Sequence, residues 1–256
     1  METNTVLSQI GNTPLVRLKQ ASELTDCHIY GKAEYFNPGE SVKDRAALFI
    51  VQDAIKRKLI SKGGTIVEGT AGNTGIGLAI VCKEYDLKLK IVIPKTQSIE
   101  KKETLKKLGA ELIEVDAVPY ADPKNYIKQS KQIAEDLNKK ISNGVYWANQ
   151  FDNTINSEAH IQTTAEEIWN QTAGTIDGFT CAVGTGGTLA GVSLGLKNKN
   201  KNIKIALSDP MGSSLYSHIK HNKLESAGSS ITEGIGTGRI TKNFDKALVD
   251  EAFQTN

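Results

Sequence analysis

Lys43 lies in the stretch Asn37–Arg45, "NPGESVKDR", which is typical of a turn followed by the start of a helix. Ser41 is a good N-cap residue, and Asp44 three positions later completes a capping-box pattern. A helix N-terminus carries partial positive charge, so a lysine ammonium in the first turn is electrostatically unfavourable. Its unfavourable position makes Lys43 a candidate functional residue. Taken alone, the stretch is equally consistent with a capped surface helix that carries an incidental lysine.

A second candidate site is the stretch Thr65–Ala79, "TIVEGTAGNTGIGLA", in which a predicted strand ends at Glu68 and a helix follows. The hydroxyls of Thr70 and Thr74, together with the exposed amides of a helix N-terminus, suit a carboxylate ligand. The alternative is a tight turn before a capped helix, and the stretch alone does not decide between the two.

The third candidate is "GTGGT", residues 184–188, between an apolar predicted strand and a predicted helix. Its glycines let the backbone approach an anion closely, while stacked amides and the helix dipole favour a phosphate. The stretch therefore predicts a phosphate site, with a plain turn as the alternative.

The same glycine-rich stretch completes neither common nucleotide-binding pattern. GxxxxGK[ST] is absent from the chain, and GxGxxG fails because Leu189 occupies the third glycine position. Asp209 nevertheless follows the next predicted strand at about the distance expected of a ribose-binding acid. A nicotinamide-dependent oxidoreductase therefore stays open as an alternative.

Short β-branched runs alternate with longer helical patterns along the chain, and these elements must hold the three stretches. The predicted strands are His28–Glu34, Thr65–Glu68, Lys90–Ile93, Glu111–Val115, Gly178–Val183 and Lys204–Leu207. The predicted helices lie near residues 43–58, 74–85, 98–108, 123–139, 157–170 and 188–197. Such alternation predicts an α/β protein whose helices cover a mostly parallel sheet.

Composition narrows the function classes. The 256 residues include 31 basic and 29 acidic ones, for a net charge of +2, so no strong field indicates a nucleic-acid or membrane partner. Cys27, Cys82 and Cys181 show no CxxC spacing, which argues for a reducing compartment and against disulfides or a cysteine–zinc site. The histidines show no metal-ligand spacing either, so we predict no metal site. No secretory leader or membrane-spanning run is visible, and we expect a cytoplasmic location.

With these stretches in view, the sequence resembles the cysteine synthase family of fold-type II pyridoxal-phosphate enzymes. The resemblance runs in order along almost the whole chain, through "IGNTPLVRL" (10–18), "NPGESVKDRAA" (37–47), "GTAGNTGIGLA" (69–79), "WANQFDN" (147–153), "AVGTGGTLAG" (182–191) and "EGIGTG" (233–238).

The resemblance implies a role for each stretch. It identifies Lys43 as the lysine that forms the Schiff base with pyridoxal phosphate, which accounts for an amine at a helix start. It implies that the cofactor phosphate binds to Gly184, Thr185, Gly186, Gly187 and Thr188, and the cofactor ring hydroxyl to Asn73. The implied substrate-binding residues are Thr70, Gly72, Asn73, Thr74 and Gln150, with Gly234 and the rest of Gly234–Gly238 lining the substrate side.

The fold implied by the resemblance is two three-layer α/β domains of the tryptophan synthase β-like type. A large domain that binds the cofactor phosphate would comprise residues 1–40 and 151–256, and a smaller mobile domain residues 41–150. Because the chain ends at Asn256, before typical family members do, the C-terminal part of the large domain is expected to be missing.

The implied reaction is a β-replacement that makes L-cysteine and acetate from O-acetyl-L-serine and sulfide, through an aminoacrylate intermediate. Lys43 would take the proton from the substrate Cα, and the smaller domain would close over the bound carboxylate. The resemblance also implies a homodimer, and a further partner in the C-terminal tail of serine acetyltransferase.

Three alternatives stay open beside this reading. The same fold also carries cystathionine β-synthase and serine or threonine dehydratase activities. A short homologue that binds without turnover is another class.

Ala71 stands where the family usually has serine, so one hydroxyl is missing from the predicted carboxylate site.

Overall fold

The computed structural model describes residues 5–70 and 72–255, and these residues form two compact units with separate cores. The first unit comprises the chain up to Ile10 together with Asn37–Ile155. The second comprises Gly11–Phe36 and the chain from Asn156 onward. Parallel strands alternate with helices in both units, so the predicted α/β class is confirmed. Ala71 lies outside the described residues.

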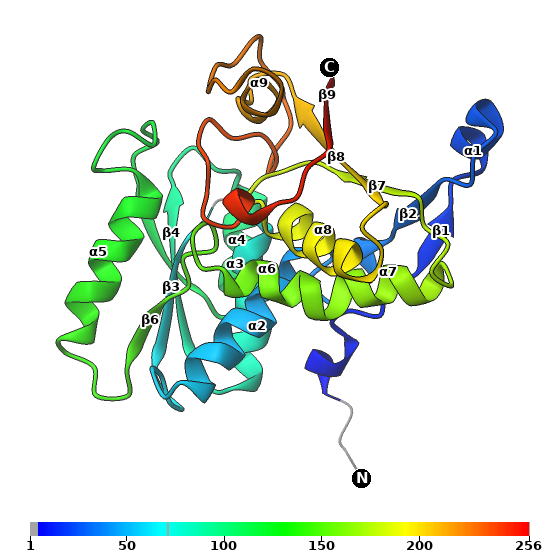
Figure 1. The fold of residues 1–256 in the computed structure, drawn as a ribbon. Helices are drawn as coiled ribbons and strands as arrows, with labels where there is room; N and C mark the ends of the chain where they lie inside the picture. Colours follow the sequence, from blue (N-terminus) through cyan, green and yellow to red (C-terminus); the bar gives the residue numbers. More distant parts are fainter. Residues whose placement is uncertain (1–4, 71, 256) are drawn as a thin grey trace. The chain divides into compact units, whose positions relative to one another are not determined.

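The first unit is built on a four-stranded parallel sheet in the order β5-β4-β3-β6 (Figure 1). Its strands are β3 (Thr65–Gly69), β4 (Lys88–Pro94), β5 (Glu111–Val115) and β6 (Val145–Trp147). Its helices are η1 (Val6–Gln9), α2 (Lys43–Lys56), α3 (Asn73–Glu84), α4 (Ile99–Lys107) and α5 (Tyr126–Asn138).

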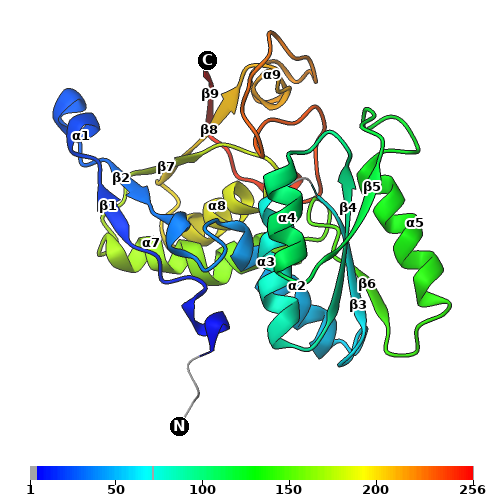
Figure 2. The same cartoon turned by 180° about the vertical axis from the view of Figure 1, so that it is seen from behind.

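Helices cover both faces of this sheet, which explains the β-branched runs of its central strands. Helices α2, α3 and α4 lie on one face and α5 on the other, as both views show (Figures 1 and 2). Because successive strand residues point to opposite faces, Ile66 joins the core under α2 and α3, whereas Val67 joins the core under α5.

The second unit contains a two-stranded antiparallel sheet, β1-β2, and a three-stranded parallel sheet, β7-β8-β9. Its strands are β1 (Leu15–Arg17), β2 (Tyr30–Lys32), β7 (Gly178–Cys181), β8 (Lys204–Pro210) and β9 (Glu251–Thr255). Its helices are α1 (Lys19–Thr25), η2 (Glu34–Phe36), α6 (Ile155–Ala159), the π-helix η3 (His160–Thr164), α7 (Ala165–Gln171), α8 (Gly187–Lys199), α9 (Leu215–His221) and η4 (Phe244–Lys246).

Helix α8 lies directly against the continuous run of α6, η3 and α7 in this unit. The contact is close because Gly191 carries no side chain: a Cβ there would come within 2.3 Å of the Ser157 carbonyl oxygen. The buried side chains Leu189, Val192 and Leu196 of α8 pack with Ile205 and Leu207 of β8 to form the core. The glycine-rich stretch therefore leads into a helix that is anchored along its length.

Most predicted elements are confirmed, with ends shifted by a few residues. The predicted strand His28–Glu34 is too long, because only Tyr30–Lys32 pairs with a neighbour. Strands β1, β6 and β9 are not among the predicted strands; β1 and β6 have three residues each, too few to show a pattern. Within 5–70 and 72–255, no helix is long and apolar enough to cross a membrane.

Candidate functional site

Lys43 is the first residue of α2, but the predicted capping box before it is wrong. The N-cap position is Val42, which makes no side-chain capping bond, and Ser41 Oγ instead accepts a hydrogen bond from the Lys43 backbone N–H at 3.2 Å. Asp44 Oδ2 accepts from the Gly39 backbone N–H at 2.5 Å rather than from Ser41. The physical reason is burial: the Asp44 side chain is fully buried, and it stabilises the preceding turn from inside.

The start of α2 lies beside α3 because Gly77 of α3 has no side chain. A Cβ at Gly77 would come within 3.1 Å of the Asp44 Cα. Lys43 and the second candidate stretch therefore belong to neighbouring helices of the same unit.

The N-terminus of α3 brings together several predicted substrate-binding residues. Gly72 occupies its N-cap and Asn73 its first position, and the Gly72 backbone N–H donates to Thr70 Oγ1 at 3.3 Å. Thr74 Oγ1 donates to Gln150 Oε1 at 2.5 Å, although the two residues are 76 positions apart. A Cβ at Gly72 would meet no atom of the described residues within 4 Å, so there is space for a ligand atom at this helix end.

The glycine-rich stretch of the second unit has the backbone that an anion site needs. Gly186 has φ of +86°, a left-handed conformation that favours glycine, and α8 begins at Gly187. A Cβ at Gly187 would come within 2.1 Å of Asn156 Oδ1, so only glycine fits. Thr185 Oγ1 accepts hydrogen bonds from Asn156 Nδ2 at 3.0 Å and from the Gly187 backbone N–H at 3.3 Å.

The stretch "EGIGTG" lies against the beginning of this loop. A Cβ at Gly184 would come within 2.1 Å of the Gly234 carbonyl oxygen, and the Gly236 backbone N–H donates to the Val183 carbonyl at 2.7 Å. The structure thus brings Gly184–Thr188 and Gly234–Gly238 together within the second unit.

Two buried polar residues that the sequence analysis missed support the loop. Thr241 Oγ1 donates to the Thr185 carbonyl at 2.6 Å, and Asn243 Oδ1 accepts from the Ser157 backbone N–H at 3.2 Å. Neither side chain is exposed. Their only signal in the sequence is their position shortly after "EGIGTG", because type alone does not distinguish a buried threonine or asparagine from a surface one.

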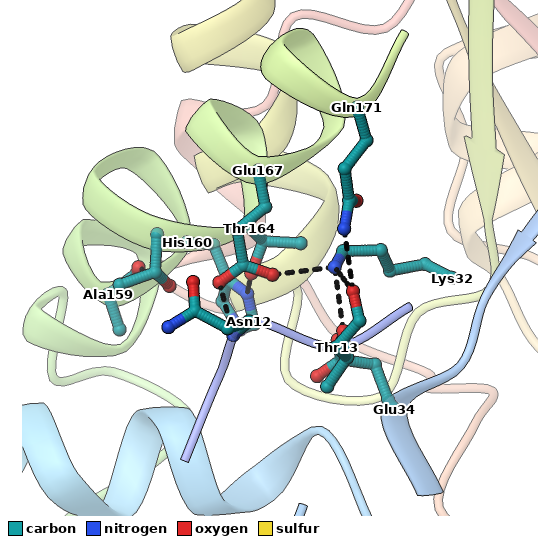
Figure 3. Close-up of polar contacts among 10 residues, drawn as sticks. Asn12, Thr13, Lys32, Glu34, Ala159, His160, Thr164, Glu167 and Gln171 are labelled. Atoms are coloured by element: carbon teal, nitrogen blue, oxygen red, sulfur yellow. Dashed lines mark hydrogen bonds and ion pairs between the residues drawn. The ribbon is translucent and has the colours of Figure 1, made fainter. Parts of the chain in front are cut away.

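His160 was also missed as a site residue, and it contacts the loop through the last predicted phosphate ligand. Its Nε2 lies 3.2 Å from Thr188 Oγ1. Its Nδ1 lies 2.8 Å from Thr164 Oγ1 (Figure 3). If the Thr188 hydroxyl donates a hydrogen bond to an anion, the His160 Nε2–H donates a hydrogen bond to Thr188 Oγ1. His160 Nδ1 then accepts a hydrogen bond from the Thr164 hydroxyl. His160 and Thr164 are the first and last residues of the π-helix, an irregularity that is frequent at functional sites.

The N-terminal stretch "IGNTPLVRL" has a structural part in the second unit. Lys32 Nζ and the Asn12 backbone N–H contact the two carboxyl oxygens of Glu167 at 2.5 and 2.9 Å, and Lys32 Nζ also donates to Thr13 Oγ1 at 2.7 Å (Figure 3). Gln171 Nε2 donates to the Thr13 carbonyl at 2.9 Å. The network holds the stretch against α7, the helix that continues from the π-helix.

Burial raises the pKa of two carboxyl groups at strand ends. The pKa of Glu68 in β3 rises to about 8 because burial disfavours the charged form. The pKa of Asp209 in β8 is raised for the same reason. Asp209 is fully buried, and its Oδ2 accepts from the Tyr216 backbone N–H at 2.7 Å at the start of α9. A carboxyl group used in this way is not presented to a ribose, which removes the main support for the nicotinamide alternative.

These residues fit pyridoxal phosphate, a ligand with a phosphate group and an aldehyde. The glycine loop offers backbone amides at the N-terminus of a 13-residue helix, and side chains at Gly184 or Gly187 would clash with the surrounding residues. Within its own unit, Lys43 places an amine at a helix start, the group with which an aldehyde condenses.

Comparisons with known proteins point to the same cofactor. The sequence pattern of the family described as "Pyridoxal-phosphate dependent enzyme" matches residues 6–254. The chain is 54% identical over 246 residues to cysteine synthase 1 of Neurospora crassa and 54% identical over 243 residues to cysteine synthase 1 of Emericella nidulans. Each alignment covers 94% of this chain but 64% of the relative, so the chain spans 64% of the length of these curated relatives.

Solved structures give the same assignment. A hydrogen sulfide-producing enzyme from Fusobacterium nucleatum superposes with a TM-score of 0.82 at 36% identity, covering 100% of this chain and 80% of that one. An O-acetylserine dependent cystathionine beta-synthase from Helicobacter pylori superposes with a TM-score of 0.85 at 32% identity, covering 99% and 79%. The fold-type II class inferred from the resemblance is thereby confirmed, and the chain belongs to the pyridoxal-phosphate dependent enzyme family.

Proposed function

We propose that this chain carries the cysteine synthase reaction, the β-replacement that makes L-cysteine and acetate from O-acetyl-L-serine and sulfide. The observation that carries the proposal is the 54% identity to cysteine synthase 1 of Neurospora crassa over nearly the whole chain. Because the chain spans 64% of that relative, the activity of the whole protein is part of the proposal.

The proposal assigns the residues of the site as the sequence motifs suggest. When bound, pyridoxal phosphate supplies an aldehyde that condenses with amines and a ring that withdraws electrons from the substrate Cα. The amides and hydroxyls of Gly184–Thr188 would hold its phosphate, Asn73 would contact its ring hydroxyl, and Lys43 Nζ would bind its aldehyde. Support comes from the glycine backbone around Gly186 and from the helix N-terminus that follows.

The substrate is held by its α-carboxylate. The backbone amides at Gly72 and Asn73, the hydroxyls of Thr70 and Thr74, and the Gln150 amide surround the space at the start of α3. Partial positive charge at this helix end favours an anion there. Gly234 and the residues up to Gly238 line the substrate side.

Lys43 moves the proton in this scheme. With the cofactor and substrate bound, its Nζ would take the proton from the substrate Cα. Acetate would leave from Cβ, hydrosulfide would add at the same carbon, and the Lys43 ammonium would return the proton to Cα. We propose that the residues around 41–150 close on the bound carboxylate and exclude water during these steps.

The nearest alternative within the family is a different acceptor or leaving group. The Helicobacter pylori neighbour is an O-acetylserine dependent cystathionine beta-synthase, so a thiol in place of sulfide is the competing reading. A serine or threonine dehydratase, or a homologue that binds without turnover, would use the same binding residues. We also infer a homodimer and a cytoplasmic location, the latter supported by the absence of CxxC spacing among the three cysteines of the sequence.

Visible absorption of the protein reconstituted with pyridoxal phosphate tests the proposal. O-acetylserine should change the absorption of the bound cofactor, and sulfide should restore it while cysteine accumulates. Lys43→Ala should abolish both changes, because neither the covalent link nor the proton transfer can form. Lys56→Ala, at the exposed far end of the same helix, is the matched control and should behave as wild type.

The outcomes separate the alternatives. Bound cofactor that responds to O-acetylserine, but yields product with a thiol and none with sulfide, would replace cysteine synthase by the cystathionine-forming reading. Bound cofactor with no response to any amino acid would leave a binding homologue.

A further inference from the structure

Glu68 is a buried acid next to the substrate-binding stretch, and the proposed reaction does not use it. It precedes Gly69 at the end of β3, and its side chain is 1% exposed. Among the described residues, its Oε2 atom has no hydrogen-bond partner. A buried carboxyl group with an unpartnered oxygen costs free energy, so its position next to Thr70 calls for an explanation.

The hydrogen bonds that the Glu68 carboxyl group accepts come from one turn. Its carboxyl group accepts hydrogen bonds from the backbone N–H groups of Asn149 and Gln150 and from the Gln150 side chain. This turn follows β6, which pairs with β3 in the sheet. Asn149 adopts a left-handed backbone with φ of +48°, an uncommon conformation that the bonds to Glu68 help to hold.

These bonds determine which way the Gln150 amide faces. Its Oε1 accepts the Thr74 hydroxyl at 2.5 Å, and its Nε2 donates to Glu68. A side-chain amide has one oxygen and two N–H donors, so placing the oxygen at Thr74 places both donors at the other end of the amide, where Glu68 accepts a hydrogen bond. The reversed amide would place an oxygen where the N–H groups now lie.

The direction of this amide matters for the class of ligand. A carboxylate has acceptor oxygens only, so it binds the N–H end of an amide and is repelled by the oxygen end. The Gln150 side chain is 4% exposed, so a wrongly directed amide would be desolvated as well as repulsive.

We propose that Glu68 is a positioning residue that fixes the orientation of the Gln150 amide, so that the site accepts the α-carboxylate of an amino acid. The proposal deepens the proposed function and rests on the assignment of Gln150 as a substrate-binding residue.

The protonation state of Glu68 is compatible with this role. An ionised carboxylate here would repel the substrate carboxylate, but burial raises the pKa of Glu68 to about 8, so the group is neutral at pH 7. The other titratable group that it influences is Tyr126 of α5, whose pKa is raised by burial and by the charge of Glu68. A neutral acid supports the turn without opposing the ligand.

Two matched amines separate carboxylate recognition from every other property of the site. L-alanine and ethylamine both react with the bound cofactor but differ only by the α-carboxylate, and neither carries a leaving group. Their dissociation constants follow from the change in visible absorption of the reconstituted protein on titration. The ratio of the two constants measures the contribution of the carboxylate contacts.

Glu68→Met keeps the side-chain volume but cannot hold the Gln150 amide. It should raise the dissociation constant of L-alanine about tenfold or more, which is the effect of losing a hydrogen bond to a charged group. The dissociation constant of ethylamine should stay within about twofold of its wild-type value. Glu68→Gln, which can still accept these N–H bonds, should keep the ratio within about threefold of wild type. Glu68→Asp, a milder change should the methionine variant not fold, should fall between them because the carboxyl group is withdrawn by one methylene.

Equal weakening of both amines in Glu68→Met, or a wild-type ratio in Glu68→Met and Glu68→Asp, would overturn the proposal. The proposal would also be overturned if Glu68→Gln weakened L-alanine binding, relative to ethylamine, as much as Glu68→Met does. Failure of the proposed reaction gives a different result, since wild type would then still bind L-alanine more tightly than ethylamine without converting O-acetylserine and sulfide to cysteine.

Discussion

Glu68, Asp209 and Lys43 show how the surroundings of single residues set the chemistry that the chain offers. Glu68 and Asp209 are acids at strand ends with raised pKa values, and both contact the backbone of a following turn or helix. Lys43 occupies the first position of α2, where its backbone N–H is bonded by Ser41. In each case the residue type is visible in the sequence, but its protonation or contact depends on what surrounds it.

The pH dependence of stability should report the buried state of Glu68. Its pKa is about 8 in the folded chain against an ordinary value of 4.5, so the folded state keeps a proton that the unfolded chain releases. Its contribution to stability is therefore complete below about pH 4.5 and is lost as the pH rises through about 8. The loss is on the order of 3–5 kcal/mol, at about 1.4 kcal/mol per pKa unit.

Glu68→Gln carries no titrating group at this position and should lack this part of the slope. Urea unfolding of both proteins at several pH values between 5 and 8 gives the difference in their free energies of unfolding. This difference should shift in favour of the variant as the pH rises. Parallel curves would show that Glu68 titrates at its ordinary pKa.

At the scale of elements, each unit carries a candidate stretch at a helix N-terminus, and the second unit adds an internal network. Helix α3 begins at the polar stretch of the first unit, and α8 begins at the glycine loop of the second. The Lys32–Glu167 pair holds the N-terminal stretch to α7, with the two side chains 10% and 12% exposed. The helices were predictable from their periodicity and from the glycine-rich stretches before them, whereas the network joins residues 135 positions apart.

Breaking the Lys32–Glu167 pair should destabilise the second unit strongly. Lys32→Met or Glu167→Leu alone leaves one charge without its partner in a site of low exposure, which should cost about 3–5 kcal/mol. The double variant should cost less than the sum of the two, because neither charge remains. Urea denaturation of the four proteins completes the cycle.

The pair Lys19–Glu23 is the matched control, since its side chains are 83% and 60% exposed and lie 4.0 Å apart. The same cycle there should give at most about 0.5 kcal/mol. Equal coupling in the two cycles would mean that burial does not strengthen the Lys32–Glu167 contact.

At the scale of the whole molecule, the chain has two separate cores. Ile91 lies in the core under α2 and α3 of the first unit, and Leu207 lies in the core of the second. Each unit draws on two segments of the chain, because the N-terminal part crosses from one to the other near Ile10 and again near Asn37. The composition of the chain does not reveal this exchange, since no linker-like segment marks either crossing.

Core truncations should therefore act on one unit at a time. Ile91→Ala and Leu207→Ala each remove a fully buried side chain and should cost about 2–5 kcal/mol. Hydrogen exchange measured by mass spectrometry should show faster exchange in β3 and β4 for the first variant and in β7 and β8 for the second. Faster exchange of both units in both variants would instead indicate a single cooperative unfolding unit.

The sequence by itself determined the class of the fold, the position of Lys43 at a helix start and the glycine loop between a strand and a helix. These features are local, because helix periodicity, alternation and glycine spacing depend on residues that are near one another in the chain. The tertiary structure alone decided that Gln150 faces Thr74, that Asp44 bonds the turn at Gly39 rather than a capping box, and that Thr241 supports the loop at Thr185. These contacts depend on burial and on packing between distant segments, and neither has a signature in residue type or spacing.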